Sequence, residues 1–368
     1  MSKIKIGFVG VGAISRIYLE NLTGTFKEVE VIGVCDLIRE RAERAVEKYN
    51  IPKLYNDMYE LFADPEVDIV LNITRPYEHF DVTMEALKAG KHVYSEKPLA
   101  ATLEEGRQIM ALAKEKGLMV GGAPDTFMGA GIQTCRRLIE DGYIGDVIGA
   151  NAQMLCHGHE TWHPDPEFYY KHGGGPLFDM GPYYVTALLN LLGNVDAVYS
   201  MTKRGFDKRT ITSEPHFGEI IDVDVDTHVV GTLRFESGAV ATLITSFDTY
   251  IGRNAIEIYG TKGTLYVPDP NCFGGPVKLY RPEDGEIREL PLVYRYREDS
   301  RGLGLADMAK ALQTGRKFRA CSDMTFHALE VMEGLIVSGR EKREIAIESR
   351  FEKKAIMEVP TMPGILEA

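Results

Sequence analysis

The sequence predicts an α/β protein with two domains, and three observations lead to this fold class. The chain has 368 residues, which is more than one hydrophobic core usually holds. Strand and helix patterns alternate along the first third, which is typical of a doubly wound parallel sheet. After about residue 124, short strands joined by tight turns indicate an antiparallel meander in an α+β domain. We therefore expect domains at 1–124 and 125–368.

The first predicted strand, residues 3–9, runs into the glycine-rich turn GVGAIS at 10–15, and a helix follows. Gly10 permits a tight turn, and Gly12 lets the backbone approach a pyrophosphate. The helix that begins near Ala13 offers free N–H groups and its positive dipole end to that anion. Strand, glycine turn, helix and strand together predict a dinucleotide-binding (Rossmann) domain, and the alternative is a turn that serves packing alone.

Asp36 stands at the tip of the second predicted strand, VEVIGVCD. Its carboxylate can accept hydrogen bonds from both adenosine ribose hydroxyls and would repel a 2′-phosphate, so NAD is favoured over NADP. Arg39 and Arg41 lie just beyond and could bind a phosphate, so NADP stays possible. The residues of these two turns that we expect to contact the cofactor are Gly10, Gly12, Ala13, Ile14, Asp36, Leu37 and Arg41.

The alternation continues to residue 123, with helices predicted at 39–49, 58–63, 80–89 and 103–116 and strands at 53–55, 67–74, 90–98 and 118–123. Ligands of such sheets bind beyond the carboxyl ends of the strands. The candidates at or just past these ends are Thr74, Arg75, Pro76, His79, Glu96, Lys97 and Asp125. Thr74, Arg75, His79, Glu96 and Lys97 are expected at the cofactor, and Asp125 at the substrate.

Lys97 precedes Pro98, which favours an extended backbone and disfavours helix. A lysine at a strand end above nicotinamide can hydrogen-bond a substrate hydroxyl and stabilise an alkoxide while hydride leaves. The alternative is a surface lysine paired with Glu96.

The second domain begins with a helix at 131–141, which ends at Gly142, and a strand at 147–158. Further strands fall within 227–267, and two helices close the fold at 305–314 and 324–338. One face of this sheet can cover the cofactor domain and the other a second subunit, so we expect a homodimer or homotetramer.

The segment 156–172, CHGHETWHPDPEFYYKH, carries His157, His159 and His163, which resemble a metal trio. No carboxylate or cysteine falls at a convincing fourth spacing, so we expect no metal. The segment is better interpreted as a polar, aromatic loop over the substrate. Trp162 could lie against nicotinamide or a sugar face, while His163 and His157 could bind hydroxyls. The alternative is a loop held by aromatic packing.

The stretch GGGPLFDMGPYY at 173–184 places Asp179 four residues before Tyr183. Residues i and i+4 at a helix start lie on one face, so both side chains can reach one ligand. The alternative for Asp179 is a helix N-cap. The three glycines are expected to let the backbone pass close to substrate and cofactor.

Composition limits the partners and the compartment. The formal charge of −12 disfavours nucleic acid and anionic membranes, and no apolar run reaches membrane-spanning length. The five cysteines form no CxxC pair, and the N-terminus lacks the features of a secretory signal. We therefore expect a cytoplasmic enzyme with reduced cysteines.

The motifs GVGAIS, TRPYEH (74–79), AGKHVYSEKP (89–98) and GGGPLFDMGPYY make the chain resemble the glucose–fructose oxidoreductase and inositol dehydrogenase (Gfo/Idh/MocA) family over almost its full length. The resemblance implies a Rossmann domain and a second domain with a large, mostly antiparallel, open sheet. It also implies a nicotinamide cofactor and hydride transfer at a carbon of a sugar, cyclitol or related polyol. The lysine of EKP, here Lys97, is the commonest catalytic element of the family.

One residue departs from the pattern of many members. They carry histidine four residues after the aspartate, whereas this chain has Tyr183 there, as the glucose–fructose oxidoreductase and dihydrodiol dehydrogenase branches do. A free phenol has a pKa of about 10, and we expect a nearby ammonium to lower it. Tyr183 would then remove the hydroxyl proton, Lys97 would stabilise the alkoxide, and Asp179 would hold a neighbouring hydroxyl.

Two other functions stay open at this point. Some relatives oxidise a sugar transiently, eliminate a glycosidic group and return the hydride, which makes them NAD-dependent glycosidases. A non-catalytic NAD-binding sensor would keep the fold without the chemistry.

Overall fold

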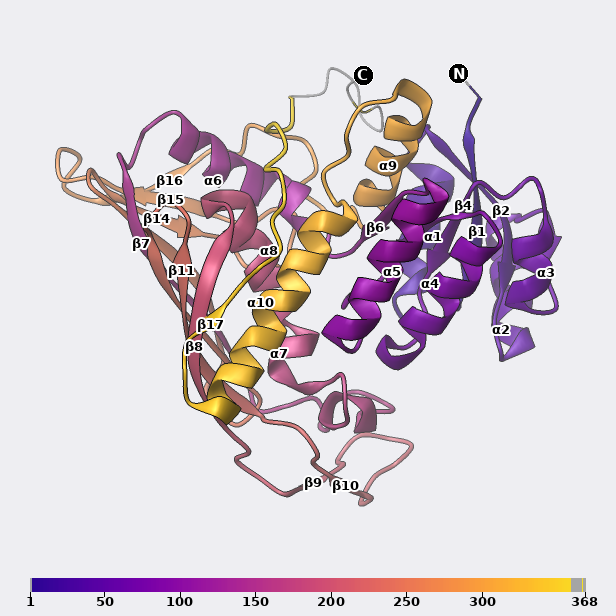
Figure 1. The fold of residues 1–368 in the computed structure, drawn as a ribbon, viewed down its shortest axis with the longest axis horizontal. Helices are drawn as coiled ribbons and strands as arrows, with labels where there is room; N and C mark the ends of the chain where they lie inside the picture. The colour runs from indigo at the N-terminus through magenta and orange to yellow at the C-terminus, as the bar shows by residue number, and fades with distance from the viewer. Residues whose placement is uncertain (1, 359–365, 367–368) are drawn as a thin grey trace.

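The computed structural model describes residues 2–358 and residue 366, and it contains two large sheets side by side (Figure 1). The six-stranded sheet is parallel throughout and has the order β3-β2-β1-β4-β5-β6. Its strands are β1 (Ile4–Val9), β2 (Val29–Cys35), β3 (Lys53–Leu54), β4 (Ile69–Asn72), β5 (His92–Ser95) and β6 (Val120–Gly122). The order reverses between β1 and β4, and ligands of doubly wound sheets bind at this point.

The helices of this sheet are α1 (Ser15–Gly24), α2 (Arg39–Tyr49), α3 (Met58–Ala63), α4 (His79–Lys88) and α5 (Leu103–Lys116), with a short 3₁₀ turn η1 (Pro76–Glu78) before α4. Local sequence explains their limits. Asp57 caps α3 by accepting a hydrogen bond from the Glu60 N–H, and Thr102 and Glu105 form a capping box at the start of α5. Gly117, at φ 64°, ends α5. The predicted Rossmann alternation is confirmed.

The second sheet has nine strands in the order β16-β15-β14-β13-β7-β12-β11-β8-β17. Its strands are β7 (Val147–Leu155), β8 (Val195–Lys203), β11 (His228–Phe235), β12 (Val240–Ser246), β13 (Arg253–Gly260), β14 (Thr264–Val267), β15 (Val277–Tyr280), β16 (Ile287–Leu290) and β17 (Ile345–Ala346). Only the β12–β7 pair among its described pairings is parallel, so the mostly antiparallel sheet is confirmed.

Helices cover one face of this sheet and connect it to the first (Figure 1). They are α6 (Ala130–Glu140), α7 (Gly175–Asp179), α8 (Gly181–Leu192), α9 (Leu303–Thr314) and α10 (Ser322–Glu341). Helix α10 packs on β8 and α8 and also reaches α5, while α9 packs on β6. The Gly122 N–H donates to the Ala320 carbonyl. The chain therefore returns from the second sheet to the edge of the first.

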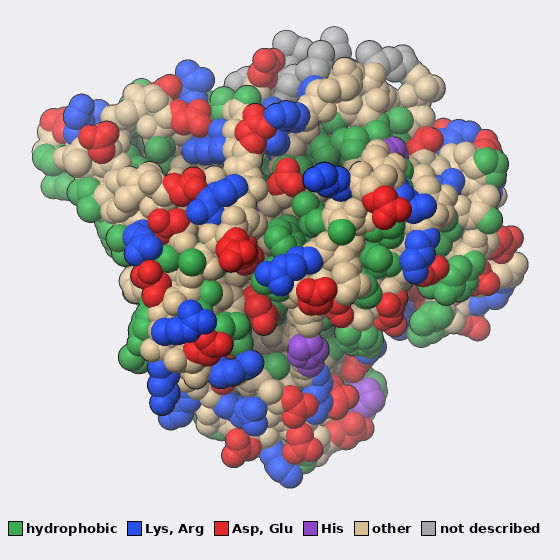
Figure 2. Space-filling model, in the orientation of Figure 1, with side chains coloured by type: hydrophobic (Ala, Val, Ile, Leu, Met, Phe, Trp, Pro, Cys, Tyr) green, Lys and Arg blue, Asp and Glu red, His purple; other side chains and the backbone are tan. Residues whose placement is uncertain are grey.

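Short elements of the segment 156–226 lie at the lower end of the molecule in Figure 1. They include the 3₁₀ turn η3 (Glu167–Tyr170) and a small hairpin of β9 (Lys208–Thr210) and β10 (Ile220–Asp222). Another 3₁₀ turn, η2 (Thr126–Met128), follows β6. On the face drawn in Figure 2, acidic and basic side chains lie interspersed.

The expectation that Asp179 and Tyr183 lie at the start of the same helix is wrong. Asp179 ends α7, and α8 begins at Gly181 with Met180 in the N-cap position and no side-chain cap. The Asp179 carboxylate instead accepts hydrogen bonds from Lys97 and His159, so it is not free to cap a helix.

The glycine run before Asp179 serves the packing of the protein's own backbone. Gly173 and Gly175 have φ of 79° and 82°, a region that side chains disfavour. A Cβ on Gly174 would lie 2.5 Å from the Phe168 carbonyl oxygen. The run lets the chain turn tightly under η3 and deliver Asp179 to its partners.

Among the described residues, no helix combines the length and apolar character needed to cross a membrane.

Candidate active site

The glycine turn after β1 leaves open space beside its second glycine. Gly10 has φ 92°, and a Cβ there would lie 2.7 Å from the Ile73 carbonyl oxygen. Apart from its two chain neighbours, no described residue has a heavy atom within 4 Å of a Cβ built on Gly12. The Ser15 hydroxyl closes the turn by donating to the Gly12 carbonyl at 2.6 Å. Since α1 begins at Ser15, its free N–H groups adjoin this space. The turn therefore fits a dinucleotide pyrophosphate.

Asp36 links the two nucleotide turns through its carboxylate. It accepts hydrogen bonds from the Val11 N–H at 2.6 Å and from the Ile38 N–H at 2.7 Å. Its carboxylate lies at the end of β2, where an adenosine ribose is expected. The side chains of Ala13, Ile14, Leu37 and Arg41 are exposed around it.

A groove of about 400 Å³ between α1 and α2 adjoins the glycine turn. Its lining includes Val11 and Gly12 and the four basic side chains Arg16, Arg41, Arg44 and Lys48. The predicted Arg41 therefore lies beside the turn, in a setting that attracts anions.

The predicted residues beyond β4 and β5 divide into buried supports and exposed groups. His79 is 1% exposed, and its ring nitrogens lie 2.8 Å from the Pro98 carbonyl and 3.1 Å from the Thr74 carbonyl. Glu96 accepts hydrogen bonds from the Tyr18 hydroxyl and from the Lys97 N–H. Both residues hold loops in place. Arg75 is exposed and forms an ion pair with Asp165.

Lys97 and Asp179 form the centre of the candidate site. The Lys97 Nζ donates to the Asp179 carbonyl and to its carboxylate, both at 2.7 Å, and the two side chains are 16% and 14% exposed. Burial acts to lower the pKa of Lys97, but the Asp179 carboxylate outweighs it, so the pKa is raised. Burial acts to raise the pKa of Asp179, but Lys97 and His159 bring it well below its usual range. Both groups are therefore charged at neutral pH, and the Lys97 ammonium pairs with Asp179 and not with Glu96, as the alternative interpretation had it.

Tyr183 lies next to this pair, with the centre of its ring 5.4 Å from the Lys97 Nζ. Burial raises the pKa of the Tyr183 phenol, while Lys97 and then Arg301 act to lower it. Burial prevails, so the net shift is upward. The expectation of a lowered pKa is wrong, because the loss of water around a buried phenolate outweighs the nearby ammonium. Tyr183 is protonated at neutral pH.

The three histidines of the aromatic loop make different contacts and do not form one group. The His159 Nε2 lies 3.2 Å from the Asp179 carboxylate, and the rings of Trp162, Tyr169 and Phe247 surround its imidazole. The His163 Nδ1 accepts from the Asp165 N–H.

His157 instead stacks on Tyr250, with ring centres 3.9 Å apart. Trp162 is 61% exposed. Among the described residues, no group of three or more His, Cys, Asp or Glu side chains is arranged to hold a metal ion.

Asp125, expected at the substrate, is 1% exposed and supports another loop. Its carboxylate accepts hydrogen bonds from the Gly302 and Gly304 N–H groups at 2.9 and 3.0 Å. Burial raises its pKa to about 6, against the effect of those two donors. Its contacts place it under the turn that carries Arg301.

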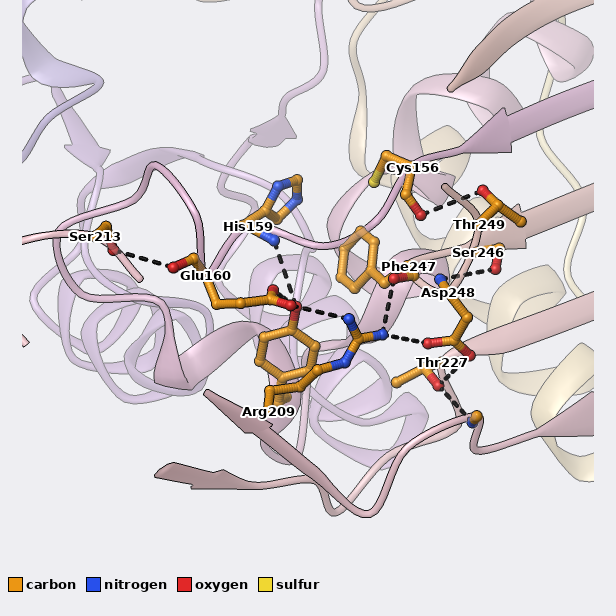
Figure 3. Close-up of polar contacts among 12 residues, drawn as sticks. Cys156, His159, Glu160, Arg209, Ser213, Thr227, Ser246, Phe247, Asp248 and Thr249 are labelled. Carbon is orange, nitrogen blue, oxygen red and sulfur yellow. Dashed lines mark hydrogen bonds and ion pairs between the residues drawn. The ribbon is translucent and has the colours of Figure 1, made fainter. Parts of the chain in front are cut away.

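Three residues near the site were not predicted as site residues: His159, Arg301 and Arg209. Figure 3 shows Arg209 between the carboxylates of Glu160 and Asp248. Its guanidinium lies 2.9 Å from Glu160 and also donates to the Phe247 carbonyl at 2.8 Å. Arg209 thus joins the β9–β10 hairpin and the end of β12 to the aromatic loop. Only the HxHE pattern around His159 offered a signal in the sequence.

The chain matches two family descriptions that together cover most of its length. Residues 4–122 match "Oxidoreductase family, NAD-binding Rossmann fold", and residues 132–266 match "GFO/IDH/MocA C-terminal domain". These matches confirm the dinucleotide-binding prediction.

Curated relatives are dehydrogenases and reductases. The 1,5-anhydro-D-fructose reductase of Ensifer adhaerens is 30% identical over 267 residues, covering 70% of this chain and 74% of that protein. The D-glucoside 3-dehydrogenase of Escherichia coli is 28% identical and covers 78% and 82%. The myo-inositol 2-dehydrogenase of Thermotoga maritima is 28% identical and covers 72% and 75%.

Solved structures share the fold. An NAD-binding oxidoreductase from Klebsiella pneumoniae superimposes with a TM-score of 0.82 at 21% identity, covering 95% of this chain and all of that one. Levoglucosan dehydrogenase in complex with NADH and levoglucosan gives a TM-score of 0.81 at 19% identity, covering 94% of this chain and 100% of that one.

Proposed function

The chain belongs to the Gfo/Idh/MocA family of NAD-binding oxidoreductases, and from this we propose that it interconverts a secondary hydroxyl and a ketone of a sugar, cyclitol or related polyol. The names of its curated relatives support this substrate class. The observation that carries the proposal is the Lys97–Asp179 ion pair beside the Tyr183 phenol. It lies at the carboxyl end of β5 in the sheet that bears the glycine turn.

The cofactor site is assigned to the residues that fit a dinucleotide. Gly10, Gly12 and the start of α1 would hold the pyrophosphate, and Asp36 would accept from the ribose. When bound there, NAD would supply the acceptor or the donor of the hydride.

Lys97 and Tyr183 act together on the reacting oxygen of the substrate. Both are hydrogen-bond donors at neutral pH, because the pKa of each is raised. Two donors stabilise negative charge on that oxygen, and in ketone reduction Tyr183 can give it a proton. In alcohol oxidation Tyr183 must first lose its own proton, so oxidation should accelerate as the pH rises.

Asp179 and His159 hold this arrangement in place. The Asp179 carboxylate accepts from Lys97 and contacts the His159 imidazole, so it fixes the ammonium instead of gripping a substrate hydroxyl as first expected. Trp162, exposed beside His159, is available to contact a sugar face.

The variant Tyr183→Phe tests the proposal. We expect kcat to fall by about 10²–10⁴, the usual contribution of a proton-transferring group, while NAD affinity is almost unchanged. NADH absorbance with a panel of sugars, cyclitols and glycosides measures turnover, and calorimetry measures NAD binding.

Tyr184→Phe is the matched control, because the buried Tyr184 hydroxyl has no hydrogen-bond partner among the residues that the structure describes. Unchanged turnover in Tyr183→Phe would remove Tyr183 from the chemistry. Release of free sugar from a glycoside without net NADH would identify an eliminating glycosidase instead. Tight NAD binding with no turnover of any compound would favour a sensor.

The outer face of the second sheet is proposed to pair two copies of the chain. Tyr199 and Met201 on β8, Val230 on β11 and Val240 on β12 are exposed on this face. Exposed apolar side chains grouped on one sheet face are typical of a protein interface. Sedimentation velocity of Met201→Glu against the unmodified protein tests it, and an unchanged oligomeric state would contradict it.

A further inference from the structure

The carboxylate of Glu96, just after β5, is buried and accepts hydrogen bonds from two parts of the chain. The residue is 8% exposed. One oxygen accepts from the Tyr18 hydroxyl at 2.7 Å, and the other accepts from the Lys97 N–H at 2.9 Å. In the part of the chain that the structure describes, no Lys, Arg or His side chain forms an ion pair with this carboxylate. A buried charge without a cation depends on its hydrogen bonds, so both donors are needed to hold it.

Tyr18 connects this carboxylate to the nucleotide-binding helix. It lies in the first turn of α1, the helix whose free N–H groups adjoin the glycine turn, and its side chain is fully buried. Burial, followed by the charge of Glu96, raises the pKa of the Tyr18 phenol well above its usual range. The hydroxyl is therefore protonated at neutral pH and donates to Glu96. This hydrogen bond joins the start of α1 to the residue that precedes Lys97.

The backbone that leads into Lys97 is held by the sheet on one side and by Glu96 on the other. The Glu96 N–H donates to the Asn72 carbonyl of β4 at 2.9 Å, which extends the ladder between β4 and β5. The Lys97 N–H comes after this ladder and uses the Glu96 carboxylate as its acceptor. The same backbone carries the ammonium that reaches Asp179 at 2.7 Å. The Glu96 carboxylate thus helps to fix the point from which the Lys97 side chain extends.

We propose that Tyr18 is a positioning residue for Lys97: its hydroxyl fixes the Glu96 carboxylate, and that carboxylate fixes the Lys97 backbone. A short chain of hydrogen bonds then links the pyrophosphate-binding end of α1 to the ammonium. Misplacement of a catalytic group by about 1 Å can slow a reaction strongly, so loss of one member of this chain should slow turnover without weakening NAD binding. The inference rests on the proposed function in giving Lys97 a catalytic task.

The experiment compares Tyr18→Phe with Tyr94→Phe as its matched control. Both rings are fully buried, but the Tyr94 hydroxyl has no hydrogen-bond partner among the described residues. Tyr94→Phe therefore removes a buried phenol oxygen without breaking a hydrogen bond. Protein labelled with ¹⁵N at its lysines reports the Lys97 amide by NMR without cofactor or turnover, and Lys97→Arg assigns the resonance. We expect Tyr18→Phe to shift this resonance and Tyr94→Phe to leave it in place.

Turnover provides the second readout. In Tyr18→Phe we expect kcat to fall by about tenfold, the size of one hydrogen bond to a charged group, while KM for NAD changes by less than about twofold. A role in stability alone would lower the free energy of unfolding and leave kcat of the folded protein unchanged. Because Tyr18 acts through Glu96, the double variant Tyr18→Phe/Glu96→Gln should be no slower than Glu96→Gln alone.

A folded Tyr18→Phe protein with an unmoved Lys97 resonance would overturn the inference, as would an unchanged kcat or additive losses of kcat in the double variant. If Tyr18→Phe does not fold, Glu96→Asp decides, because it keeps the charge and shortens the reach to Tyr18. An unmoved resonance there overturns the inference equally. Because the resonance needs no activity, it still tests the link from Tyr18 through Glu96 to Lys97 if the protein turns over no polyol.

Discussion

The glycine turn and the charged cluster around Lys97 are built from different kinds of groups. The turn uses neighbouring residues and backbone groups, and its character depends on the open space beside Gly12. The cluster uses charged and polar side chains from separate segments: Lys97 after β5, His159 in the aromatic loop, and Asp179 and Tyr183 at the α7–α8 junction. A single added methyl group should therefore impair the glycine turn, whereas the cluster around Lys97 should be impaired by removal of a charge.

Lys97→Met should have the largest effect, because it removes the charge at the centre of the cluster. We expect kcat to fall by about 10²–10⁴. Asp179 would also be left buried without its cation, which typically costs about 3–5 kcal/mol of stability. NADH formation and urea unfolding measure the two effects.

The double variant Lys97→Met/Asp179→Asn separates them. It should recover stability, since no unpaired charge remains, but not turnover. Near-normal turnover in the single variant would contradict the role of Lys97.

Arg209→Met tests whether the stability of the ion-pair network of Arg209, Glu160 and Asp248 also depends on charge. Glu160 and Asp248 would lose their shared cation, and we expect the free energy of unfolding to fall by about 3–5 kcal/mol. The neighbouring Lys208 is 69% exposed, so Lys208→Met should change stability by less than about 0.5 kcal/mol. Equal unfolding curves for the two variants would show that the network is not needed for stability.

Gly10→Ala and Gly12→Ala should differ in what they disturb. Gly10→Ala should destabilise the fold by about 1–3 kcal/mol, because of its φ and the nearby Ile73 carbonyl. Gly12→Ala should leave unfolding unchanged and weaken NAD binding by about tenfold or more, as expected when hydrogen bonds to a charged ligand are lost. Urea unfolding and calorimetric NAD titration measure both, and unaltered NAD affinity of Gly12→Ala would contradict the pyrophosphate assignment.

Asp165→Asn should have the smallest effect. It breaks an ion pair with Arg75 that bridges the loop after β4 and the aromatic loop, but both side chains are about half exposed. Exposed pairs contribute about 0.2–1 kcal/mol, so KM for NAD should rise by less than about fivefold. The difference from the unmodified protein should shrink at high salt. A loss of activity comparable to that of Lys97→Met would show that the two regions are coupled more tightly than these contacts indicate.

Much of the fold could be predicted because its signals are local. Each predicted strand and helix of the first sheet follows from residue periodicity and caps such as Thr102, which act within a few residues. The break between α7 and α8 could not be predicted in this way. The break depends on the hydrogen bonds of the Asp179 carboxylate, and its partners His159 and Lys97 lie elsewhere in the chain.

The sequence by itself determined the Rossmann turn, the family motifs and the candidates Lys97, Asp179 and Tyr183, because each is carried by neighbouring residues. Only the tertiary structure decided which cation belongs to which acid. It paired Lys97 with Asp179 and buried Asp125 under the turn of Gly302. It also decided the direction of the Tyr183 pKa shift. Burial is set by all the segments that exclude water around a group, and no local pattern of residues records it.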